Sequence, residues 1–71
     1  MSDIPSYTPK KIIGILQKNG FEIIRIKGSH HILLNRNTNK RVVVPMHKKT
    51  LPKGTQHQIF RQSGLDIKKI K

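Results

Sequence analysis

The stretch EIIRIKGSHHILLNRNTNKRVVVP (residues 22–45) decides the fold, because it holds three short strand-like runs separated by two turns. The runs 22–27 and 41–44 are rich in the β-branched residues that strands favour, and the run 30–35 contains the apolar residues Ile32, Leu33 and Leu34. Gly28-Ser29 predicts a tight turn between the first two runs, and the polar residues 35–40 predict a hairpin loop between the second and third. Pro45 ends the third run. Two successive hairpins predict a three-stranded antiparallel meander.

A helix is predicted before this meander. Thr8 is a good N-cap, and Pro9 suits the first helical position. Asn19-Gly20 closes the segment, with Gly20 in the left-handed conformation that ends many helices. Four apolar residues recur at helical spacing on one side, namely Ile12, Ile13, Ile15 and Leu16.

A second helix is predicted after the meander, from about Pro52 to Ser63, with Gly64 as its stop. Ile59 and Phe60 are its expected core residues, and Phe21 is expected in the core as well. The fold class is therefore α+β, in the order α-β-β-β-α. Because one face of the sheet must be buried, both helices are expected on that same face.

The length of 71 residues indicates a single domain over residues 1–71, with its core at about 8–65 and a short basic tail at 66–71. The chain has no cysteine, no signal-like N-terminus and no apolar run near the roughly 20 residues that span a bilayer. Together these features predict a cytoplasmic protein without a membrane partner.

The charge is strongly one-sided: Lys and Arg total 15 and Asp and Glu total 3, giving a net charge of +12. Such an excess favours a polyanionic partner such as nucleic acid. The acidic residues Asp3, Glu22 and Asp66 are far apart, so a carboxylate cluster for two metal ions is not expected. With no cysteine and no tight ligand spacing, zinc is not expected either. We therefore predict no metal and no cofactor.

The α-β-β-β-α order is that of the double-stranded-RNA-binding domain. Several short motifs also occur in a fixed order along the chain, namely Asn19-Gly20-Phe21, Lys27-Gly28-Ser29-His30-His31, residues 42–47 (VVVPMH), Lys53-Gly54-Thr55 and residues 59–65 (IFRQSGL). Together they resemble the HicA family of bacterial toxins over about residues 9–65. The resemblance implies a fold like that of the double-stranded-RNA-binding domain, metal-free cleavage of mRNA, and neutralisation by a HicB-like antitoxin. It also implies that the catalytic histidine is the one after Gly-Ser, which here is His30.

The chemistry of RNA cleavage suits these residue types. RNA carries its own nucleophile, the 2′-hydroxyl, and histidine titrates near neutral pH, so His30 can act as acid or base. Gly28 is predicted to form the turn that holds His30 at the start of a strand. His30 also shares strand parity with Ile32 and Leu34, so the alternative is a structural histidine at the edge of the core.

Other residues are candidates for assistance and for RNA contacts. Ser29 lacks an obvious carboxylate-oriented histidine, so it is a poor nucleophile, and it is kept only as an assisting residue. His47 is a possible second acid or base, although a surface-loop histidine is the commoner case. His31 and His57 are expected to have structural or solvent-exposed roles, with an RNA contact also open to His31. The predicted phosphate contacts, each of which could instead be a solvated surface lysine, are Lys27, Lys48, Lys49 and Lys53.

Three functions remain open on the sequence. The first is the toxin endoribonuclease, with mRNA as substrate and a HicB-like antitoxin as partner. The second is a non-catalytic RNA-binding module with the same fold. The third is a small basic structural protein of a ribonucleoprotein. Growth arrest on bacterial expression, relieved by His30→Ala, would distinguish the first from the others.

Overall fold

The computed structural model describes residues 7–46 and 50–65. The chain order is α1 (Pro9–Lys18), β1 (Phe21–Lys27), β2 (His30–Asn35), β3 (Lys40–Pro45) and α2 (Lys53–Ser63). This confirms the predicted α-β-β-β-α order, with every element end within one residue of its predicted place. Within the described residues, no helix has the length and apolar content needed to cross a bilayer.

Helix α1 begins and ends where local chemistry dictates. The Thr8 hydroxyl accepts a hydrogen bond from the Lys11 N–H at 3.1 Å, and Pro9 occupies the first turn. The helix ends at Lys18, and Gly20 reverses the chain with a φ of 95°. Its apolar side is buried, with Ile12 and Leu16 at 0% exposure.

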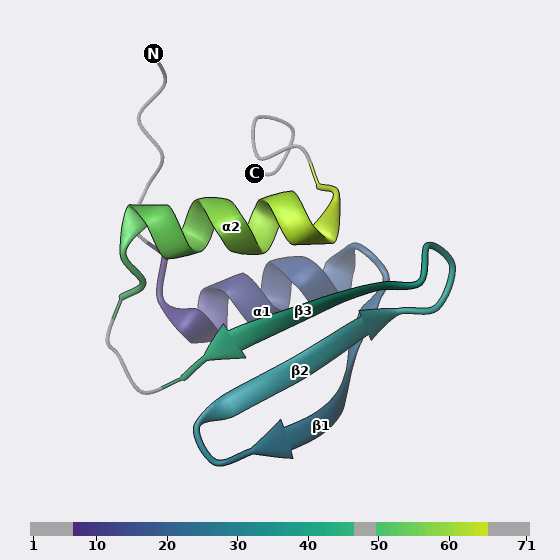
Figure 1. Ribbon diagram of the computed structural model, residues 1–71, viewed down its shortest axis with the longest axis horizontal. Coiled ribbons are helices and arrows are strands. Elements are labelled where there is room, and N and C mark those ends of the chain that lie inside the picture. The colour runs from purple at the N-terminus through teal and green to yellow at the C-terminus, as the bar shows by residue number, and fades with distance from the viewer. Residues whose placement is uncertain (1–6, 47–49, 66–71) are drawn as a thin grey trace.

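The sheet has the order β1-β2-β3, and both pairings are antiparallel. Figure 1 shows the two helices on one side of it, with α2 lying along β3. Leu33 pairs with Ile23 of β1 and with Val42 of β3, so these three residues share the helix-facing side. The core between the layers consists of Ile12, Ile13, Ile15, Leu16, Phe21, Leu33, Val42, Val44, Leu51, Ile59 and Phe60. The predicted core places of Phe21, Ile59 and Phe60 are confirmed.

Strand β1 contains an irregularity that alternation did not predict. The register with β2 shifts between Ile23 and Arg25, so Ile24 is an extra residue in the strand. Ile24 and Ile26 remain 38% and 59% exposed. The first half of β1 therefore supplies the core, and its second half extends beyond the cover of the helices.

Helix α2 is joined to the segment before α1 by polar contacts. The Oε1 atom of the buried Gln56 accepts a hydrogen bond from the Tyr7 N–H at 2.9 Å. The Leu51 N–H in turn donates to the Tyr7 carbonyl oxygen at 3.2 Å. The segments that precede α1 and α2 are thereby bonded to each other, and to α2, at one end of the helical layer.

Candidate functional site

The side of the sheet away from the helices, here called the open face, presents three rows of paired side chains. The alternation around Leu33 places His30, Ile32 and Leu34 on this side of the central strand. Their cross-strand partners complete the rows, which are Lys27–His30–Pro45, Arg25–Ile32–Val43 and Glu22–Leu34–Arg41. The open face thus has a partly apolar centre with cations on both outer strands.

His30 lies at the closed end of the first hairpin. It is exposed, and it pairs with Lys27 across the two-residue Gly28-Ser29 turn. Gly28 has a φ of 59°, which confirms the predicted turn and explains why glycine is needed there. The alternative of a core histidine is wrong, because the helix-facing residues of β2 are His31, Leu33 and Asn35.

The same turn is bonded to the segment that follows β3. The Met46 N–H donates a hydrogen bond to the Ser29 carbonyl oxygen at 2.6 Å. His30 also pairs with Pro45, the last residue of β3. The chain therefore leaves the sheet beside His30, at Pro45 and Met46.

The predicted site residues are brought together only in part. Lys27 stands next to His30, and Ser29 is exposed in the turn. Lys53 is exposed as the first residue of α2, a helix whose N-cap, Pro52, makes no side-chain cap hydrogen bond. Three further predicted residues, His47, Lys48 and Lys49, lie outside the described residues.

Sequence reasoning did not single out two cations of the open face. Arg25 lies in the row next to His30, and Arg41 lies in the third row. Both are exposed. Arg25 shares its parity with Lys27, and that signal could have placed it beside the histidine.

The other described histidines are elsewhere. His31 is on the helix-facing side of β2, where its Nδ1 atom is buried and, among the described residues, has no hydrogen-bond partner. His57 is exposed on α2. His30 is therefore the one described histidine on the open face.

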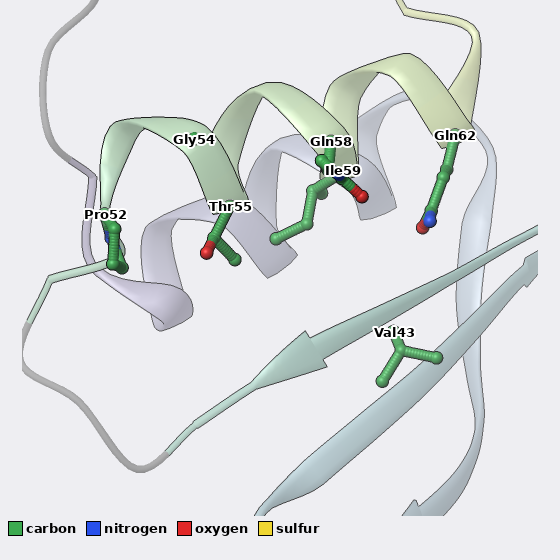
Figure 2. Close-up of a pocket in the computed structure, with 7 residues that line it drawn as sticks. All are labelled: Val43, Pro52, Gly54, Thr55, Gln58, Ile59 and Gln62. Carbon is green, nitrogen blue, oxygen red and sulfur yellow. The ribbon is translucent and has the colours of Figure 1, made fainter.

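A cleft of about 640 Å³ runs between β3 and α2. Figure 2 shows Val43 on the strand side, with Thr55 and Gln62 pointing toward the strands from the helix. The helix contributes Gly54, Thr55, Gln58, Ile59 and Gln62 to the lining. Val43 also belongs to the open face, so the cleft adjoins the row next to His30.

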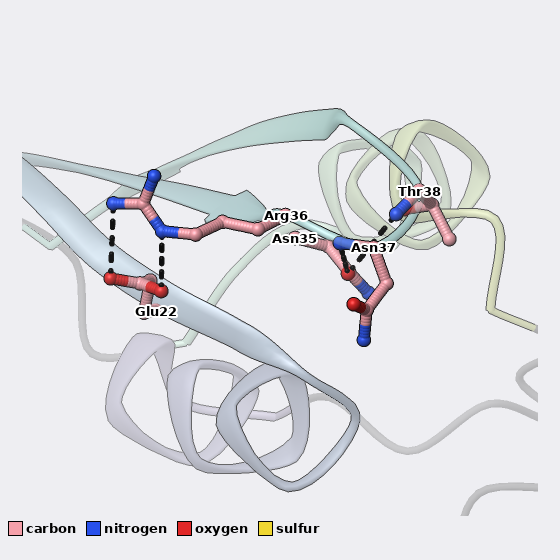
Figure 3. Close-up of polar contacts among 5 residues, drawn as sticks. All are labelled: Glu22, Asn35, Arg36, Asn37 and Thr38. Atoms are coloured by element: carbon pink, nitrogen blue, oxygen red, sulfur yellow. Dashed lines mark hydrogen bonds and ion pairs between the residues drawn. The ribbon is translucent and has the colours of Figure 1, made fainter.

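Glu22 is the one carboxylate within residues 7–46 and 50–65. Its oxygens accept hydrogen bonds from Arg36 Nε at 2.9 Å and from Arg36 Nη2 at 3.4 Å (Figure 3). This hydrogen bond and the negative charge of Glu22 raise the pKa of the Arg36 guanidinium. Within the described residues, no three His, Cys, Asp or Glu side chains come together as metal ligands.

Asn35 makes several hydrogen bonds at the end of the sheet that is far from His30. Its Oδ1 atom accepts hydrogen bonds from the N–H groups of Asn37 and Thr38, at 2.9 and 3.3 Å (Figure 3). Its Nδ2 atom donates to the Asn19 carbonyl oxygen at 3.3 Å. This buried amide therefore bonds both to the β2–β3 loop and to the end of α1.

Comparison with known proteins gives one clear relationship. A comparison with curated proteins gave no match. A family model described as the HicA toxin of bacterial toxin–antitoxin systems matches residues 9–65, which span all five helices and strands. The chain is therefore a member of the HicA toxin family of bacterial toxin–antitoxin systems.

Proposed function

We propose that this toxin is an endoribonuclease that cleaves mRNA with His30 as its acid–base group, without a metal ion. The observation that carries the proposal is the row Lys27–His30–Pro45 on the open face. It combines an exposed imidazole with a neighbouring ammonium group at a rigid hairpin end. Membership of a toxin family supports an activity that harms the cell, and the net charge of +12 supports a polyanionic target.

The proposed reaction uses the RNA's own 2′-hydroxyl. One basic group removes its proton, and the oxygen attacks the adjacent phosphorus while the bond to the 5′-oxygen breaks. The leaving 5′-oxygen takes a proton, so the products are a 2′,3′-cyclic phosphate and a 5′-hydroxyl. Histidine can serve either proton transfer near neutral pH. His30 takes one of these roles, and His47, with Ser29 as a lesser candidate, is proposed to assist.

Cations supply the remaining chemistry. Lys27 is directly opposite His30, and Arg25 follows in the next row, so both can stabilise negative charge that develops on the phosphate. Lys48, Lys49 and Lys53 are proposed as further phosphate contacts. At Lys53 the first-turn N–H groups of α2 add to the attraction.

The available donor set supports a reaction without metal. Two-metal nucleases hold their cations with a cluster of carboxylates. Among the described residues only Glu22 offers one, and it is bound to Arg36. Cation side chains therefore take the place that a metal ion holds in other nucleases.

Membership of a toxin–antitoxin family implies an antitoxin partner. We propose that this partner is HicB-like and that it is acidic where it contacts the toxin, since opposite charge favours fast and specific association. The cytoplasm is the proposed location for both the mRNA substrate and this complex.

The test is cleavage of a labelled transcript by the purified chain in excess EDTA. We expect cleavage to persist in EDTA and to fall at least about a hundredfold in His30→Ala, the usual loss on removing an acid–base group. His31→Phe is the matched control, because His31 is the next residue but faces the helices. Equal cleavage by His30→Ala, or cleavage only with added Mg²⁺, would overturn the mechanism. Binding without cleavage by the wild type would favour the RNA-binding module instead.

A further inference from the structure

The cleft between β3 and α2 has no charged side chain in its lining. Its volume of about 640 Å³ lies within the range of pockets that hold small molecules. Every lining side chain is apolar, a hydroxyl or an amide, in a chain that has 15 lysines and arginines. A phosphate group would therefore be better stabilised on the neighbouring cationic face than inside this cleft.

The polar groups of the cleft form a line along α2. Thr55, Gln58 and Gln62 are spaced three and four positions apart, so they share one side of the helix. Within the described residues, no hydrogen bond occupies the side-chain amide of Gln58 or of Gln62. Each amide offers a donor and an acceptor side by side. Apolar contact is available from Val43, which is 40% exposed, whereas Ile59 is buried in the core behind the cleft.

The cleft is also close to the proposed acid–base group. Val43 is two residues before Pro45 on β3, and Pro45 is the cross-strand partner of His30. Diagonal neighbours of this kind lie about 7–8 Å apart. A nucleotide whose phosphate lies beside His30 could therefore place a neighbouring base in the cleft.

We propose that this cleft binds one unpaired nucleobase of the RNA substrate and sets the base preference at that position. The inference rests on the proposed function, because it assigns a substrate subsite next to the reacting phosphate. The flat base would lie against Val43, and its edge would bond to the amides of Gln58 and Gln62. Single-stranded RNA is read in this way, by apolar contact with base faces and hydrogen bonds to base edges.

The side-chain amides of Gln58 and Gln62 also indicate which base the cleft prefers. Glutamine and asparagine pair with adenine through two hydrogen bonds, one donated and one accepted. Adenine offers this pair on its Hoogsteen edge, as N6–H and N7, whereas the same edge of uracil offers only the O4 acceptor. We therefore expect adenine to be preferred in the cleft.

The first test measures binding and does not depend on cleavage. The ¹⁵N-labelled His30→Ala protein is titrated with short oligoadenylate and oligouridylate RNAs while the side-chain NH₂ signals are followed by NMR. We expect oligoadenylate to shift the Gln58 and Gln62 signals and oligouridylate to shift them much less. The signal of Gln17, an exposed glutamine on α1, should not move. The proposal would be overturned if the Gln58 and Gln62 signals did not move, or if both RNAs moved them equally. It would also be overturned if the antitoxin shifted these signals and neither RNA did.

The second test uses cleavage sites. Fragments of a mixed-sequence transcript are mapped for the wild type, for Gln58→Ala/Gln62→Ala and for the control Gln17→Ala. The wild type should prefer adenine at one position near the cut by roughly tenfold, which is the usual discrimination of a two-bond contact. The double variant should lose that preference, and the control should keep it. A lower rate with an unchanged preference would overturn the proposal, provided that thermal melting shows the double variant folded.

The two tests separate the subsite from the reaction. If the wild type cleaves no RNA, the proposed function fails, while the NMR titration still decides whether the cleft takes a base. If the wild type cleaves through His30 but the Gln58 and Gln62 signals stay unmoved, only the subsite fails.

Discussion

Lys27 and His30 are direct cross-strand partners at the two sides of the Gly28-Ser29 turn. Opposed residues in an antiparallel pair have Cβ atoms about 5 Å apart, so one phosphate can contact both side chains. The short turn leaves the pair little freedom to separate. Because of this arrangement, we expect the loss of Lys27 to weaken phosphate binding at His30 more than the loss of any other described cation.

We predict that Lys27→Ala weakens RNA binding and makes the binding less sensitive to salt. Each phosphate contact to single-stranded RNA contributes about 0.7 to the slope of log affinity against log salt, so the slope should fall by about that amount. Lys18→Ala is the control, since Lys18 is an exposed lysine in the last turn of α1. Binding isotherms at several salt concentrations provide the measurement. An equal loss in both variants would mean that only the overall charge matters.

Substitution by alanine should change the free energy of unfolding in opposite directions at Gly28 and Gly14. Gly28→Ala should lower the free energy of unfolding by about 1 kcal/mol, because Gly28 has a positive φ that alanine adopts at a cost. Gly14→Ala should raise it by up to about 1 kcal/mol, because Gly14 is inside α1 and no atom lies within 4 Å of the added Cβ. Urea denaturation of both variants tests this. A stabilising Gly28→Ala would contradict the assigned turn.

Gln56→Ala should lower the free energy of unfolding by about 1–3 kcal/mol. The substitution leaves the Tyr7 N–H without its acceptor in a partly buried place, and it empties space at a residue with 0% exposure. Gln58→Ala, two residues along the same helix but exposed, serves as the stability control. Thermal melting distinguishes them. Equal melting temperatures would show that the Tyr7 contact adds nothing to stability.

We expect the toxin and its antitoxin to associate through charge. Co-expression with the product of an adjacent acidic reading frame should suppress growth arrest, and the two chains should co-elute. The dissociation constant should rise with salt, because screening weakens attraction between exposed charges. A dissociation constant that is independent of salt would contradict the proposed charge complementarity.

The element order could be predicted from the sequence because its signals are local. Thr8, Pro9 and Gly20 mark the ends of α1 whatever the rest of the chain does. Gly28 marks the first hairpin in the same way. Such positions depend on backbone conformation and capping, which a short window of sequence contains.

The faces of the strands could not be predicted in the same way. Strand β2 has apolar residues at both parities, so alternation alone does not decide whether Ile32 or Leu33 faces the helices. That choice depends on the pairing of Leu33 with Val42, a residue of another strand that a short window of sequence does not contain. The buried places of Asn35 and Gln56 were also missed, because each is set by a partner from a distant segment. The role of His30 stays a prediction, supported by its exposed position beside Lys27.

The extra residue at Ile24 gives the two halves of β1 separate evolutionary constraints. With strict alternation from Phe21, both Arg25 and Lys27 would point into the apolar layer, whereas the shift turns them outward. Selection on mutations near Phe21 therefore acts through folding, and selection on mutations near Lys27 acts through ligand binding. A lineage could alter the proposed RNA contacts of the second half without disturbing the packing set by the first, whereas an insertion that changed the parity between them would damage both together.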